Sequence, residues 1–406
     1  MTMDNRQLST TKFLNGLKLL AVLPPVGIGW LIYLSRWQWL KLFKRPKTIA
    51  HDMMLAFILL LMVVTGLNLN HHDWKSVLLS MLMLFVLMNL WLLCRQSAHV
   101  ITLADVRQFI IQFGLYIMVS GNLFHWLNHW LNFPNWLKFL LGDLLWGYAA
   151  NKNRLFGSAY NPNDACCLML IALGLLLVQL TTHATTKIAT TSMQWTQWGW
   201  AALLMLGIYQ TKSRTGLAIM VLMILWASYM LNWRHGLVVT SLLGAAGMLL
   251  LIYLPRSHSW LASWQGRTEI WKNSWALFKN APLFGVTYYG FAEQYLKLTG
   301  TSVPHAHDIF LMLLASFGIL GGVGFLMLIV GGGWSMKQIW QSPQRHPNLR
   351  YFAMTLPIIL AYGLTDFVLS SMQVLIVILL IIAYWHHEQH AQPQLALARK
   401  KEIHHF

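Results

Sequence analysis

Residues 76–94 read SVLLSMLMLFVLMNLWLLC, and no charged side chain interrupts them. A helix of about 20 residues, rising about 1.5 Å per residue, crosses the ~30 Å hydrocarbon core of a membrane. In lipid, a continuous apolar run satisfies its backbone hydrogen bonds only as a helix, whereas a membrane strand alternates apolar and polar residues. This stretch therefore predicts a membrane-spanning helix.

Similar apolar runs recur along the chain and predict an all-α, polytopic membrane protein with about eleven spans, within a range of ten to twelve. Pro24 and Pro25 interrupt the first run, which would instead make two half-helices. The segment 136–150 is too short to cross and is predicted to be interfacial or re-entrant. No signal-peptide cleavage site follows the first run, so we expect that run to remain as an anchor. The spans are expected near residues 14–34, 51–69, 76–94, 109–129, 165–181, 195–211, 215–232, 236–254, 308–330, 351–367 and 369–385.

The composition agrees with this class of protein. Hydrophobic residues make up 57% of the 406 residues and charged residues only 10%, against about 25% charged in soluble domains. The net charge of +17 fits contact with a bilayer of anionic lipid, and nothing in its pattern suggests nucleic acid. The cysteines Cys94, Cys166 and Cys167 fall in or beside spans and are expected to be free thiols.

The orientation depends mainly on the connection 35–52, whose basic residues place it in the cytoplasm by the positive-inside rule. Those residues are Arg36, Lys41, Lys44, Arg45 and Lys47. Alternating from there puts 131–164, 212–214 and 255–307 outside a cytoplasmic (inner or plasma) membrane, although the whole-chain tally of basic residues does not decide the matter. The last of these is the one sizeable extracytoplasmic loop that we expect.

This outer loop contains two features beyond a simple connection. Residues 266–278 repeat apolar side chains at helical spacing and predict an amphipathic helix that ends near 281–285. A helix lying on the membrane surface would explain the apolar face but not Arg267 or Glu269 at its start. Pro304-His305-Ala306-His307-Asp308 then leads directly into the next span, and an ionisable group at a membrane-edge helix start is a functional candidate.

Two further polar turns are predicted on the same outer side. Lys212-Ser213-Arg214 separates two closely spaced spans, where snorkelling Lys and Arg side chains are the simplest interpretation. Asn161-Pro162-Asn163 is a turn and cap signal just before a span. Within the later spans, Gly318 and Gly322 predict a close helix–helix contact. Asp366, near the outer end of a span, has no assignment beyond an ion pair.

These features, in this order, resemble the O-antigen ligase and polysaccharide polymerase superfamily. The most similar element is a histidine, a polar residue, nine residues, a glycine and then a small residue, here His307, Asp308, Gly318 and Gly321. The family has an amide or serine at the second position, so Asp308 departs from the pattern. Arg214 matches the arginine of a Ser-Arg turn, Arg267 a second arginine ahead of an Ile-Trp pair, and 161–163 an asparagine-proline-asparagine turn.

The resemblance covers about 150–330, which gives three regions. These are N-terminal transmembrane helices (1–150), an O-antigen ligase-like region with the outer loop (151–330), and C-terminal helices with a cytoplasmic tail (331–406). It implies transfer of a glycan from a polyprenyl (undecaprenyl) diphosphate carrier to an acceptor glycan hydroxyl, on the extracytoplasmic face. Other polysaccharide-assembly membrane proteins are candidate partners.

That reaction suits particular residue types. The permanently charged fork of arginine binds diphosphate oxygens, which makes Arg214 and Arg267 the candidate clamp. A histidine can take the proton of the acceptor hydroxyl; the family motif selects His307 over His305, and Glu269 is a reserve base. The start of a helix would favour the neutral imidazole of His307, while Asp308 would oppose that effect. The remaining substrate-binding candidates are His305, Glu269, Lys212, Asn161, Asn163, Tyr288 and Tyr289.

Other chemistries lack their signatures. The chain has no Asp-x-Asp, P-loop or Gly-x-Ser-x-Gly motif, so we expect no cofactor, metal or nucleotide. His386, His387 and His390 are read as part of a solvated tail. A lipid-linked oligosaccharide flippase or transporter is the alternative of another class, but it should show internal repeats and mid-membrane charges. We favour a polymerase of exopolysaccharide, capsule or O-antigen repeats, with ligase-type transfer to a lipid-core or protein acceptor as the alternative.

Overall fold

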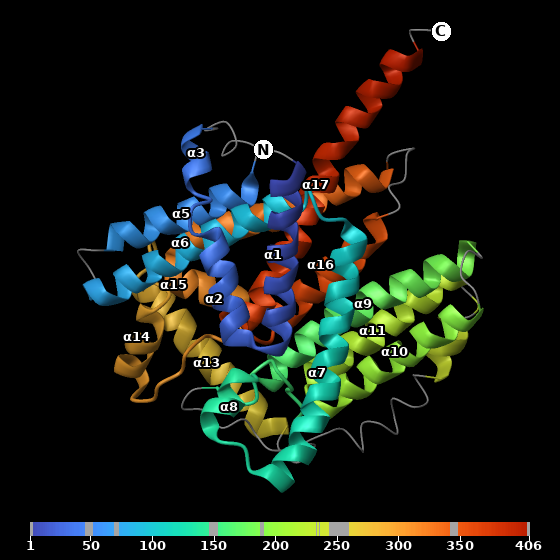
Figure 1. Ribbon diagram of the computed structural model, residues 1–406. Helices are drawn as coiled ribbons and strands as arrows, with labels where there is room; N and C mark the ends of the chain where they lie inside the picture. Colours follow the sequence, from blue (N-terminus) through green and yellow to red (C-terminus); the bar gives the residue numbers. More distant parts are fainter. Residues whose placement is uncertain are drawn as a thin grey trace.

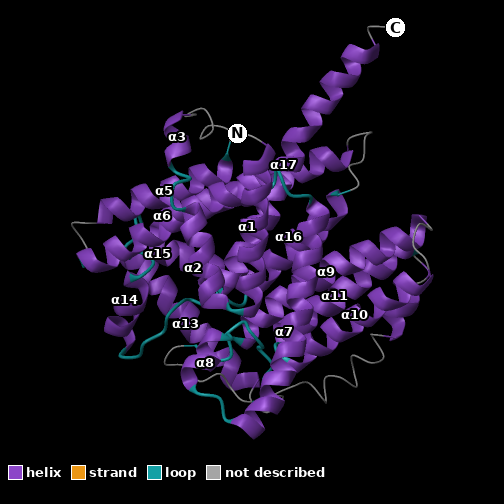
Figure 2. Cartoon of the chain, in the orientation of Figure 1, coloured by secondary structure: helices purple, strands orange, loops and turns teal. Residues whose placement is uncertain are grey.

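The computed structural model describes residues 3–44, 52–68, 73–145, 153–186, 191–232, 234, 236–242, 260–341 and 348–403. Regular secondary structure in these ranges is helical, which confirms the all-α class (Figure 2). The helices are α1 (Met3–Val22), α2 (Pro24–Ser35), α3 (Leu40–Lys44), α5 (Met53–Leu67), α6 (Trp74–Ser97), α7 (Leu103–Leu131), α8 (Asn135–Leu140), α9 (Pro162–Thr186), α10 (Thr191–Gln210), α11 (Arg214–Leu231), α13 (Trp260–Asn280), α14 (Gly290–Thr299), α15 (Ile309–Gln341), α16 (Leu349–Gly363), the 3₁₀ turn η3 (Val368–Ser370) and α17 (Met372–Ile403).

Six helices of the described ranges, α6, α7, α9, α11, α15 and α17, are long and apolar enough to cross a membrane. Two shorter apolar helices, α5 and α16, accompany them. The chain is therefore a polytopic membrane protein, and the count of about eleven spans stays a prediction. Residues 243–254 of the span predicted at 236–254 lie outside the described residues.

The first predicted span, 14–34, is two half-helices that form a hairpin. Pro24 begins α2 immediately after a break at Leu23, because a proline cannot continue the hydrogen bonds of the preceding helix but fits a first turn. The two helices then run side by side (Figure 1), and the indole of Trp30 donates a hydrogen bond to the Lys12 carbonyl over 3.0 Å. The alternative prediction of two half-helices is therefore correct for this run.

The main core is centred on α9. This helix is apolar all round, and its residues from Ala165 to Val178 are almost completely buried. It packs against α7, α10, α11 and α16, as expected for a helix with no polar face. Cys166 and Cys167 lie in this core and Cys94 is buried in α6, so all three thiols are free and enclosed, as predicted.

A second core joins the predicted outer loop to the start of α15. The predicted amphipathic helix forms as part of α13, which packs against α15, and Leu277 is buried between them. α14 follows and packs on the same cluster. The predicted interfacial segment contains the short helix α8, while residues 146–150 fall outside the described ranges. The described part of the predicted outer loop, residues 260–307, is thus a folded helical layer.

Gly318 breaks α15, and this corrects the predicted helix–helix role of Gly318 and Gly322. Its φ of 63° and ψ of −163° are non-helical, and a Cβ there would lie 2.2 Å from the Leu283 carbonyl oxygen. The amide of Ile319 donates to the Pro282 carbonyl over 2.8 Å. The loop before α14 therefore docks into the kink, and only glycine fits both the backbone and the contact. The contact of α15 with α5 is made further along, at Gly324.

Candidate active site

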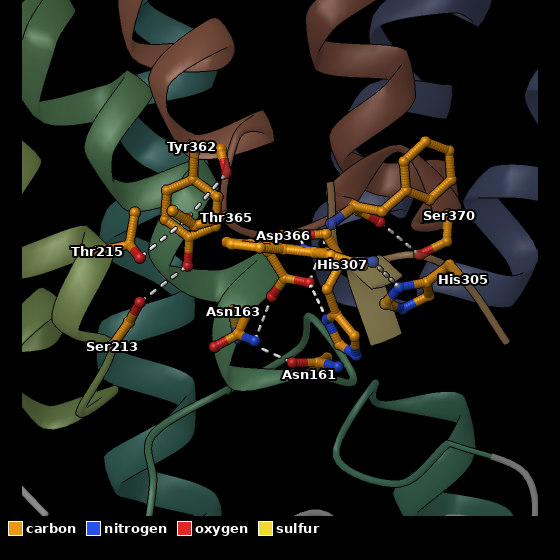
Figure 3. A network of polar contacts seen from close by, with 12 residues as sticks. Asn161, Asn163, Ser213, Thr215, His305, His307, Tyr362, Thr365, Asp366 and Ser370 are labelled. Carbon is orange, nitrogen blue, oxygen red and sulfur yellow. Dashed lines mark hydrogen bonds and ion pairs between the residues drawn. The ribbon is translucent and has the colours of Figure 1, made fainter. Parts of the chain in front are cut away.

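His307 and Asp366 form a hydrogen-bonded pair (Figure 3), beside the asparagine turn whose preceding residue, Tyr160, donates to the Phe139 carbonyl of α8. His307 precedes α15 and Asp366 follows α16; Nδ1 of the histidine lies 2.8 Å from Oδ1 of the carboxylate. Burial alone would raise the pKa of Asp366, but the hydrogen bond with His307 and nearby positive charges hold that pKa below its ordinary value. An ionised carboxylate only accepts, so Nδ1 of His307 carries the proton.

The asparagine turn holds the other oxygen of Asp366. The side-chain amide of Asn163 donates to Oδ2 of Asp366, and its carbonyl oxygen accepts from Nη2 of Arg154 over 2.7 Å. Nε of Arg154 donates to the Thr211 carbonyl, also over 2.7 Å. Asn161 fixes the turn itself, because its side-chain oxygen accepts the Asn163 amide proton over 2.8 Å. Both predicted asparagines therefore support Asp366 from the start of α9.

The turn that carries Arg214 docks on the segment just before Asp366. The hydroxyls of Ser213 and Tyr362 share a hydrogen bond of 3.0 Å, and Thr365 donates to the hydroxyl of Thr215 over 2.8 Å (Figure 3). Ser213 also caps α11 by accepting from the amide of Gly216. Arg214 is half-buried in the first turn of α11, between two residues that bond to the segment just before Asp366.

Helix α13 brings Arg267 to the same place. The indole of Trp271 donates to the backbone carbonyl of His307 over 3.4 Å. Arg267 lies one turn earlier on the same face of α13, and its positive charge is among those that lower the pKa of Asp366. Glu269, two residues on and therefore on the opposite side of the helix, is exposed. Because α13 begins at Trp260, these two charged residues lie inside the helix and not at its start as predicted, and the structure brings one of them, Arg267, to the site.

His305 and the tyrosines border the pair. The rings of His305 and His307 lie 4.3 Å apart, and burial and the charge of His307 lower the pKa of His305 to about 4, although Asp366 raises it. Tyr288 packs beside Phe367, with ring centroids 6.2 Å apart. Tyr289 is 46% exposed beyond it. His305 and Tyr288 therefore line the site, and Tyr289 lies at its outer edge.

Four residues at or beside the site adopt the left-handed backbone conformation that L-residues rarely use. The φ angles are 61° at Tyr160, 53° at Lys212, 65° at Thr287 and 52° at His307. Each costs about 1–2 kcal/mol relative to a relaxed residue, and such strain is concentrated at functional sites. Tyr160 directly precedes the asparagine turn, and Lys212 precedes the Ser-Arg turn. The fold therefore imposes unusual backbone where it presents the predicted site residues.

Asp308 does not have the role that the sequence suggested, which was to act on the protonation of His307. Its Oδ1 accepts the amide proton of Leu311 over 2.8 Å and so caps α15. Burial raises the pKa of Asp308, while the backbone amides of Leu311 and Phe310 lower it. Asp366, rather than the neighbouring acid or the helix end, is the group bonded to the His307 ring, so the expected competition between Asp308 and the helix start does not govern this histidine.

Asp366, for which the sequence suggested no more than an ion pair, is hydrogen-bonded to His307. The sequence did not identify that partner. The only signal was a lone acid at the edge of an apolar run. The His–Asp pair also forms a compact donor set with His305, because one ligand atom from each of His305, His307 and Asp366 lies within 4.8 Å of the others. The sequence predicted no metal ligands here.

Residues 199–326 match the family model described as O-antigen ligase. This range contains Arg214, Arg267 and His307, and it includes the kinked start of α15. The comparison with curated proteins gave no match. The family match confirms the resemblance seen in the motifs, while Asn163 and Asp366 lie outside the matched range.

Proposed function

We propose, on the premise that residues 199–326 belong to the O-antigen ligase family, that this protein polymerises repeat units of a cell-surface polysaccharide. The donor would be a glycan on a polyprenyl diphosphate, and the acceptor a hydroxyl of a second repeat unit. The observation that carries the proposal is the His307–Asp366 pair, set beside the segments of Arg214 and Arg267 at one end of the bundle. Such an arrangement suits glycan transfer to a hydroxyl.

His307 is the proposed general base. Because its Nδ1 proton is held by Asp366, its Nε2 keeps a free lone pair, as in other histidine–aspartate pairs. Nε2 takes the proton of the acceptor hydroxyl while that oxygen attacks C1 of the donor sugar. The bond between C1 and the diphosphate oxygen breaks, and its electron pair leaves with the diphosphate. Asp366 then stabilises the imidazolium that forms.

The two arginines are the proposed clamp for the leaving group. Negative charge grows on the diphosphate as the C1–O bond breaks, and a planar guanidinium binds two of its oxygens at once. Arg214 approaches from α11 and Arg267 from α13, so the diphosphate would lie between two helices. Because the diphosphate is already a good leaving group, the reaction requires neither a nucleotide nor a metal.

The choice of polymerase depends on the acceptor. A diphosphate-linked repeat unit would be attracted to the same basic outer surface as the donor, without a second recognition domain. The lysines of that surface are Lys212, Lys272, Lys279 and Lys297. Tyr288 and Tyr289 offer aromatic faces to the sugars. Other membrane proteins of polysaccharide assembly would supply the substrate and receive the product.

Purified protein in lipid, supplied only with a polyprenyl diphosphate-linked repeat unit and EDTA, tests the proposal. The expected product is a ladder of longer chains on a gel, and His307→Ala should remove the ladder. Transfer only to an added lipid-core or protein acceptor would establish the ligase alternative. Movement of the intact substrate across the bilayer, with no chain growth, would establish a flippase and end the proposal of an enzyme.

A further inference from the structure

The side chains of His305, His307 and Asp366 have the chemistry and spacing of a metal site. One donor atom from each lies within 4.8 Å of the others, and Nδ1 of His307 is already 2.8 Å from Oδ1 of Asp366. Two imidazoles and one carboxylate form the ligand set of many three-residue zinc sites that keep one position open. Among divalent ions, this donor set favours Zn²⁺ and similar transition metals over Mg²⁺ or Ca²⁺.

The groups around these three side chains hold them as outer-shell partners hold metal ligands. Asn163 and the backbone amide of Phe367 both donate to the Asp366 carboxylate. Trp271 donates to the carbonyl of His307, whose φ of 52° keeps the ring beside that of His305. The ligands are therefore grouped before any ion arrives, and an ion with bonds of about 2.0–2.2 Å would draw their donor atoms closer together than 4.8 Å.

We propose that these three residues bind one Zn²⁺ ion and that the bound ion switches the site off. A metal on Nδ1 of His307 replaces the proton shared with Asp366, and a neutral imidazole must then carry its single proton on Nε2. Nε2 thereby loses the lone pair that would accept the proton of the acceptor hydroxyl. The inhibitory part of this inference rests on the proposed function, whereas the metal site itself does not.

Metal binding is therefore measured first and without any glycan substrate. Full-length protein, stripped with EDTA and returned to detergent or nanodiscs, is titrated with Zn²⁺ by calorimetry. We expect one site per chain. His305→Gln and Asp366→Asn should each weaken binding by at least about tenfold. The matched control is His99→Gln, from a second close histidine pair whose rings lie 4.8 Å apart, and it should leave the affinity unchanged.

A spectroscopic measurement on the wild-type chain protects the test against a variant that fails to fold. Electron paramagnetic resonance of bound Cu²⁺ should show two imidazole nitrogens. No metal bound by the wild type, no imidazole in that spectrum, or full affinity in folded His305→Gln would overturn the site.

With a site present, transfer that falls on adding Zn²⁺ and returns with EDTA supports the switch, and transfer unaffected by saturating Zn²⁺ overturns it. A stripped protein that binds Zn²⁺ but never transfers would count against the proposed function alone.

Discussion

Among single residues, Asp366 is the one that joins two segments of the site. One carboxylate oxygen meets His307 and the other meets Asn163, so the asparagine turn and the histidine segment are joined through it. It is 5% exposed, and a buried carboxylate needs such donors because its desolvation is costly. Its partner His307 lies 59 residues away in the chain. For that reason the sequence suggested that Asp366 has a charged partner but did not identify the residue.

Replacing Asp366 by asparagine, a side chain of nearly the same size, should disable the base. The amide would donate to Nδ1 of His307, which forces the ring proton onto Nε2. We expect kcat to fall by about 10²–10⁴-fold with little change in KM, as for other histidine–aspartate pairs. The matched control is Asp308→Asn, because asparagine caps a helix as well as aspartate does. Equal losses in both variants, measured by steady-state transfer kinetics, would contradict the orienting role.

The arginine clamp makes a separate prediction at the same scale. Arg214→Ala and Arg267→Ala should each reduce transfer by at least about 10²–10³-fold, the usual effect of losing one group that stabilises transition-state charge. Lysine at either position should restore only part of the activity, since a point charge cannot bind two oxygens as a planar fork does. Arg36→Ala, at the opposite end of the bundle, is the control. Full activity in both alanine variants would end the clamp assignment.

At the scale of elements, the lengths of the apolar runs predicted where helices lie. They predicted less well where a helix is broken. Two consecutive prolines indicated that the first run could break at residue 24, because the effect of proline on a helix depends on local geometry alone. Gly318 gave no such signal. A glycine in an apolar run fits both a packing contact and a kink, and the choice depends on Leu283 and its neighbours, which come from a distant loop.

Gly318→Ala tests whether that kink holds the layer of α13 and α14 in place. The backbone of Gly318, with φ 63° and ψ −163°, lies in a region that is essentially restricted to glycine and costs about 1–3 kcal/mol for other residues, and the new methyl group would overlap the Leu283 carbonyl. We expect a lower melting temperature in detergent and loss of transfer, because the layer contains Arg267. Gly332→Ala is the control within the same helix; it has open space around its Cβ and should be neutral or slightly stabilising. Unchanged melting in Gly318→Ala would show that the layer docks without the kink.

For the whole molecule, the site is assembled from five segments that meet at one end of the bundle. They come from the start of α9, the turn before α11, α13, the approach to α15 and the end of α16. Alternation of spans predicted all five on a common side, since Asp366 was expected near the outer end of its span, and the family resemblance selected residues within the first four. The bond between Asp366 and His307 was not predicted, because nothing in the local sequence marks which distant segment completes a polar network between apolar helices.

The sidedness of this assembly is the last prediction. The basic connection that contains Phe43 is expected in the cytoplasm and the site end, including Lys279 of α13, outside. Both side chains are exposed, and the three native thiols are buried, so single cysteines introduced at these positions can be labelled over a low background. In intact spheroplasts, a membrane-impermeant maleimide should label Lys279→Cys and spare Phe43→Cys, and inverted vesicles should give the reverse. Labelling of Phe43→Cys in spheroplasts would put the His307–Asp366 pair on the cytoplasmic side. A donor glycan that had already crossed the membrane could not reach it there, and the polymerase proposal would have to be abandoned.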